Sequence, residues 1–98
     1  MAYRRPEKQT IHDRKVKEIA DSYNARAWLV KADLAGYDKP DTINGYIPDV
    51  QATLSNKWEE IIEVETQDSL QADREQQAAF QKYAAGKAFT DFKLVMAD

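Results

Sequence analysis

The sequence contains no cysteine and only one histidine, His12. The missing cysteines exclude a disulfide framework, a thiolate nucleophile and cysteine-based zinc or iron–sulfur sites. A single imidazole excludes every metal site that needs two, and it means that a Ser-His-Asp group would have to use His12. We expect His12 to be exposed in the first turn of a helix. Any metal site must therefore be built mainly from oxygen ligands, which favours hard cations such as magnesium.

Long apolar runs are also missing. No stretch of about 18 apolar residues occurs, and no apolar signal region follows the polar N-terminus, so we expect a cytoplasmic protein with no membrane segment. The 98 residues predict one domain, residues 1–98. Lys and Arg number 14 against 17 Asp and Glu, a net charge of -3. This mild acidity is not typical of proteins that bind phosphate by bulk positive charge.

Apolar periodicity predicts two helices and four strands. Residues 1–9 show no period and predict a loose basic arm. The helices are expected at residues 11–25, with Thr10 as N-cap, and from 68 or 69 to 85; the strands are expected at residues 27–34, 46–54, 58–66 and 89–96. A helix between the last two strands predicts that they pair in parallel, and short connections predict an antiparallel meander for the first three. The expected fold is α/β, with the order helix, three strands, helix, strand.

Three acidic residues are predicted to share one face of adjacent strands. Asp49 follows Pro48 early in the second strand, and Glu63 and Glu65 are two residues apart in the third. Carboxylates on neighbouring strands, about 4.8 Å apart, could bind one divalent cation, which would offset their mutual repulsion. The alternative is a half-exposed sheet whose acidic side chains are simply solvated.

The residues that form this pattern resemble a known family signature. Pro48-Asp49, then thirteen residues, then Glu63-Val64-Glu65 is similar to the motif of the PD-(D/E)XK, or restriction-endonuclease-like, nuclease superfamily. The expected element order matches that family's core from Ile11 onward, and small stand-alone members such as Holliday-junction resolvases and restriction endonucleases are the most similar.

The resemblance implies a function and a ligand set. Asp49 and Glu63 would bind Mg²⁺ (or Mn²⁺), with the backbone carbonyl of Val64 as a further ligand. The ion would polarise a scissile phosphate and activate water for hydrolysis of a phosphodiester bond. The implied partner is nucleic acid, in the first place DNA, and small relatives often form homodimers because two strands need two sites.

Some positions depart from that pattern or have two interpretations. Glu65 stands where the family usually has lysine, so the missing positive charge would have to come from Lys31 or Arg74, although a surface cation is the commoner interpretation of each. Glu18 is the candidate for the glutamate that many members carry on the first helix, or a solvated residue beside Lys15. Two rival functions stay open: a catalytically silent domain of the same fold that binds nucleic acid or protein, and an unrelated α/β interaction domain.

The first seventeen residues concentrate positive charge, and they could contact a phosphate backbone or simply be solvated. The basic residues among them are Arg4, Arg5, Lys8, Arg14, Lys15 and Lys17.

Overall fold

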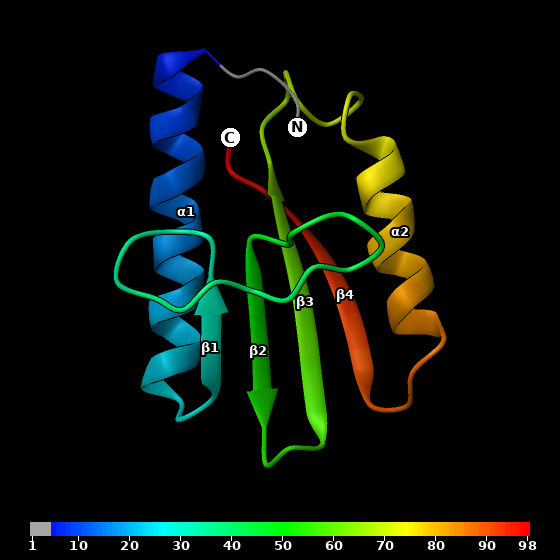
Figure 1. Cartoon of the computed structure of the whole chain (residues 1–98). Coiled ribbons are helices and arrows are strands. Elements are labelled where there is room, and N and C mark those ends of the chain that lie inside the picture. Colours follow the sequence, from blue (N-terminus) through cyan, green and yellow to red (C-terminus); the bar gives the residue numbers. More distant parts are fainter. Residues whose placement is uncertain (1–4) are drawn as a thin grey trace.

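The computed structural model describes residues 5–98, and these form two helices and four strands. In chain order the elements are α1 (Pro6–Ala25), β1 (Leu29–Ala32), β2 (Val50–Leu54), β3 (Trp58–Glu65), α2 (Arg74–Ala85) and β4 (Thr90–Met96) (Figure 1). The predicted order of helix, three strands, helix, strand is confirmed.

The four strands form one mixed sheet in the order β1-β2-β3-β4. β1 and β2 are antiparallel, as are β2 and β3, whereas β3 and β4 are parallel and are connected through α2. The predicted pairing is therefore confirmed. Val50 pairs with Ile62, so Asp49, the residue just before β2, lies next to Glu63 at the same end of the sheet.

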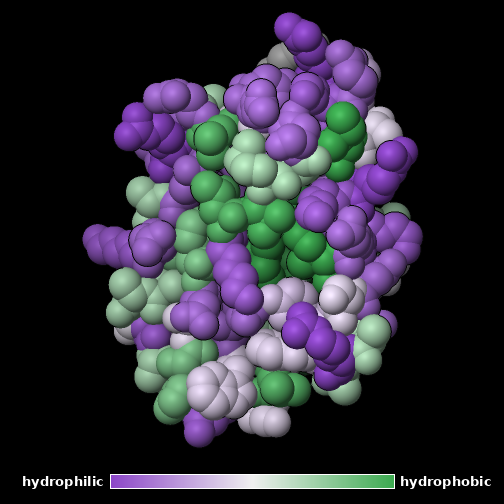
Figure 2. Space-filling view, turned by 180° about the vertical axis from the view of Figure 1, so that it is seen from behind, coloured by the Kyte–Doolittle hydropathy of each residue, from purple (hydrophilic) through white to green (hydrophobic). Residues whose placement is uncertain are grey.

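The two helices pack on opposite faces of the sheet. Ile62 packs with Val16 and Ala20 of α1, whereas its neighbour Ile61 packs with Phe80 of α2 and with Ile43 of the loop between β1 and β2. Because successive strand residues point to opposite faces, α1 covers one face and α2 with the loop covers the other. The loop crosses in front of the strands in Figure 1. Seen from behind in Figure 2, the molecule presents a band of apolar side chains between hydrophilic margins.

The helix α1 begins earlier than the sequence predicts. Pro6 occupies its first turn, where the missing proline N–H is no loss, so the loose arm is wrong for residues 6–9. Residues 1–4 of that arm lie outside the described residues. Thr10 is not an N-cap, since its hydroxyl donates to the Pro6 carbonyl oxygen within the helix at 3.1 Å. Neither helix within residues 5–98 is long and apolar enough to cross a membrane.

The strands and the second helix are shorter than predicted, because turns occupy their expected ends. Ala27 has a φ of 66°, which breaks the first predicted strand before Leu29. Asn44 and Gly45 also have positive φ and form the turn that joins Ile43 to Tyr46, so the second strand begins only at Val50, after Pro48. Residues 67–73 are turns, which delays α2 to Arg74.

Candidate metal centre

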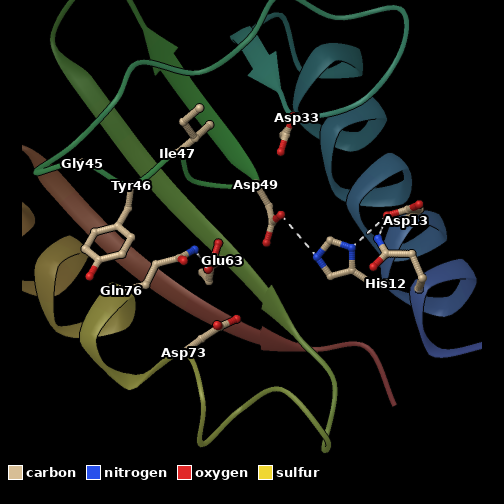
Figure 3. Close-up of a pocket in the computed structure, with 11 residues that line it drawn as sticks. His12, Asp13, Asp33, Gly45, Tyr46, Ile47, Asp49, Glu63, Asp73 and Gln76 are labelled. Carbon is tan, nitrogen blue, oxygen red and sulfur yellow. Dashed lines mark hydrogen bonds and ion pairs between the residues drawn. The ribbon is translucent and has the colours of Figure 1, made fainter. Parts of the chain in front are cut away.

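A pocket of about 330 Å³ opens at the end of the sheet where β2 begins and β3 ends. α1, the β1–β2 loop and the start of α2 form its walls (Figure 3). Its charged lining among the described residues consists of His12 and the acidic residues Asp13, Asp33, Asp49, Glu63 and Asp73. No lysine or arginine among residues 5–98 lines it. A pocket lined by five acidic side chains and one histidine favours cations over anions.

Backbone geometry fixes Asp49 at the centre of this pocket. One side-chain oxygen, Oδ2, accepts a hydrogen bond from the Val64 backbone N–H at 2.8 Å, which ties the carboxylate to β3. The other, Oδ1, lies 3.2 Å from Nε2 of His12 on α1. The carbonyl oxygen of Asp49 accepts from the Asp33 N–H at 2.9 Å and so extends the β1–β2 pairing. Asp49 is therefore held on three sides.

Glu63 is a buried carboxyl group, and one of its two oxygens has no hydrogen-bond partner among the described residues. Its residue is 2% exposed, and Oε2 accepts a hydrogen bond from the Gln76 side-chain amide. Oε1 is buried and has no hydrogen-bond partner among the described residues. Burial, and then the negative charge of Asp49, raises the pKa of Glu63 to about 11. Such an oxygen is costly to leave unpaired, so it favours a proton or a cation at this position.

Glu65 lies two residues further along the same face and is fully buried. It accepts hydrogen bonds from the Ser69 hydroxyl at 2.8 Å and from the Gln77 amide at 3.0 Å. Burial and a hydrogen bond with Asp73 raise the pKa of Glu65 to about 7. Donors from the β3–α2 turn and from α2 thus hold this carboxyl group in place.

Glu63, Glu65 and Asp73 together form a cluster that could hold a metal ion. Each offers one carboxylate oxygen, and these three oxygens lie within 4.8 Å of one another. Oxygen ligands of this kind suit Mg²⁺ or Mn²⁺, and a divalent ion would remove the repulsion that now favours protonation. The unpaired Oε1 of Glu63 is the observation that makes the residues fit a cation.

The structure brings together some of the residues that the sequence predicts for the site, and not others. Asp49, Glu63 and Glu65 meet at one end of the sheet, with the Val64 backbone between the two glutamates. Glu18 does not join them: it pairs with Lys15 at 3.1 Å, its side chain is 67% exposed, and it does not line the pocket.

The two predicted sources of positive charge also lie elsewhere. Lys31 pairs with Asp41 of the β1–β2 loop at 3.2 Å. Arg74 lines a separate groove between α2 and β4, beside Phe92 and Leu94. Neither lines the acidic pocket, so neither supplies positive charge to it.

Three residues at the site were not predicted. His12 was expected to be exposed, but it is only 6% exposed, and its side chain points from α1 to Asp49. That expectation is therefore wrong. The missed signal is its spacing of four and eight residues before Val16 and Ala20, which places it on the buried stripe of α1. Asp73 immediately precedes α2 and Gln76 lies in its first turn, and only their position after the strand acids Glu63 and Glu65 could have suggested a role.

Comparison with known proteins adds no family: no protein-family model, no curated protein and no solved structure matches the chain.

Proposed function

We propose that this protein is a metal-dependent nuclease that hydrolyses phosphodiester bonds of nucleic acid, DNA in the first place. The single observation that carries the proposal is the convergence of Asp49, Glu63 and Asp73 at one pocket, where one buried oxygen of Glu63 lacks a hydrogen-bond partner. Glu65 lies behind them and shares the carboxylate cluster with Glu63 and Asp73. A cluster of buried carboxyl groups favours a proton or a cation, and a divalent cation would offset the negative charge of several of them at once.

In this proposal each side chain has a defined task. Asp49 and Glu63 would hold Mg²⁺ or Mn²⁺, and the ion when bound would polarise the scissile phosphate and make water more acidic. The Val64 N–H and the Gln76 amide orient these two carboxylates through the hydrogen bonds described above. Asp73, which lines the pocket, would accept a proton from water near the phosphate, and the buried Glu65 would support it from behind.

Support comes from the resemblance to the PD-(D/E)XK superfamily, because both the motif residues and the element order agree with it. A homodimer with two such sites would cut both strands of a duplex. The missing lysine favours the second candidate, a catalytically silent domain of the same fold that binds nucleic acid or a protein partner. The absence of any lysine or arginine lining the pocket, within residues 5–98, is the specific observation behind that alternative.

The test is manganese- and magnesium-dependent cleavage of a substrate panel: plasmid, single-stranded DNA, branched DNA and RNA. The native chain should cut at least one substrate only when a divalent cation is present, and Asp49→Ala should abolish cleavage. Glu18→Ala is the matched control, because this exposed acidic residue lies outside the pocket and its loss should leave cleavage unchanged. Cation binding without cleavage of any substrate would favour the silent domain.

A further inference from the structure

The imidazole of His12 lies between two carboxylates at the wall of the acidic pocket (Figure 3). Its Nδ1 is 2.9 Å from Oδ1 of Asp13, and its Nε2 is 3.2 Å from Oδ1 of Asp49. The ring is 6% exposed, so this arrangement is set inside the protein rather than on a mobile surface side chain. It is also the only imidazole in the sequence.

Asp13 fixes which way the ring faces. Its side chain is 60% exposed, and a carboxylate oxygen only accepts hydrogen bonds, so the proton of this hydrogen bond lies on Nδ1 of His12. The Gln9 amide donates to the same oxygen of Asp13 at 2.8 Å and steadies it from one turn earlier. A carboxylate on one ring nitrogen, with the other nitrogen directed into a site, is the arrangement that orients metal-binding histidines.

The distance between His12 and Asp49 suits two ligands of one ion. Adjacent ligands of an octahedral ion, each about 2.1 Å from it, lie about 3.0 Å apart. The 3.2 Å between Nε2 and Asp49 Oδ1 is close to this spacing. Oδ2 of Asp49 is turned to the Val64 N–H, so Oδ1 is the oxygen that faces both the imidazole and the pocket.

We infer that His12 Nε2 and Asp49 Oδ1 bind the same divalent cation, with Asp13 orienting the imidazole. This inference rests on the proposed metal-dependent function and specifies the ion. An imidazole ligand among carboxylates favours Mn²⁺, Co²⁺ or Zn²⁺ over Mg²⁺, which prefers an all-oxygen shell. The site therefore binds Mn²⁺, Co²⁺ or Zn²⁺ in preference to Mg²⁺, and the His12 imidazole is the ligand responsible for this preference.

The first test uses the native chain and Mn²⁺ alone. Calorimetry should show binding to Mn²⁺ at least about tenfold tighter than to Mg²⁺. Electron paramagnetic resonance of the bound Mn²⁺ should show hyperfine coupling to a directly bound nitrogen. This readout requires neither nucleic acid nor cleavage.

The second test uses variants. His12→Phe keeps a ring in the buried space and should weaken Mn²⁺ binding by about 10–100-fold, abolish the nitrogen coupling and reduce the preference for Mn²⁺ over Mg²⁺. Asp13→Asn, at an exposed position, should weaken Mn²⁺ binding about tenfold with the fold intact, which keeps the test valid if His12→Phe does not fold. Glu18→Gln on the same helix is the control and should match the native chain.

The outcomes separate this inference from the proposed function. If Mn²⁺ binds in an Asp49-dependent manner but without nitrogen coupling, His12 merely forms an ion pair with Asp49 and the inference is overturned, while the nuclease proposal stands. If the native chain binds no divalent cation, both are overturned.

Discussion

The buried carboxyl group of Glu63 makes the stability of the metal-free protein depend on pH in a predictable direction. Its pKa is raised from 4.5 in the folded chain, so above about pH 4.5 the folded state holds a proton that the unfolded state has lost. Folding stability must then fall as pH rises, by about 1.4 kcal/mol per pH unit for each such group. Between pH 5.5 and 7.5, Glu63 alone accounts for about 3 kcal/mol, and Glu65 adds to the loss up to its pKa of about 7.

Glu63→Gln removes this dependence, because the amide has no proton to lose and still accepts from Gln76. Urea denaturation in EDTA at pH 5.5 and 7.5, followed by fluorescence of Trp28 and Trp58, measures it. The free energy of unfolding of the variant should fall by about 3 kcal/mol less than that of the native chain. Glu18→Gln, at an exposed position, should follow the native chain. Parallel pH curves for Glu63→Gln and the native chain would refute the argument.

Three further changes have defined outcomes. Ile62→Ala, at a fully packed position between β3 and α1, should lower the free energy of unfolding by about 2–5 kcal/mol in urea denaturation. Gln76→Leu removes the donor to Glu63, so calorimetry should find Mn²⁺ affinity about 10–100-fold weaker; unchanged affinity would mean that Gln76 does not orient the carboxylate. Mn²⁺ at about 100 times its dissociation constant should raise the free energy of unfolding by about 2.7 kcal/mol at pH 7.5, and Asp49→Ala should lose this gain; equal gains in both would place the ion elsewhere.

The fold was predictable because the apolar periods of the sequence are clear. Ile62 and Val64 alternate with Glu63 and Glu65, which is possible only on a strand with two different faces, and this predicted both the strand and the shared face of the acids. The start of the second strand was predicted too early: the strand was expected from residue 46, but Pro48 has no N–H to donate and β2 begins only at Val50.

The parts of the site that come from the helices were not predictable in the same way. An error of five residues in the start of α1 placed His12 in a first turn, where exposure is the ordinary expectation, instead of on the buried stripe with Val16. Asp73 contacts Glu65 because residues 67–73 form turns before α2. The path of a seven-residue turn segment cannot be predicted from the apolar periodicity of the sequence. Contacts between elements far apart in the sequence depend on how these elements pack, and this packing cannot be deduced from a single sequence.

The most direct test of the central claim is single-turnover cleavage of labelled duplex and branched DNA during a Mn²⁺ titration, with the native chain and Glu63→Gln. The native chain should cut only in the presence of the cation. Glu63→Gln, shown to be folded by its urea curve, should cut about 100-fold more slowly or not at all, since a cation's contribution to phosphoryl chemistry is several kcal/mol. Equal cleavage by the two proteins, or cleavage by the native chain in EDTA, would contradict the account.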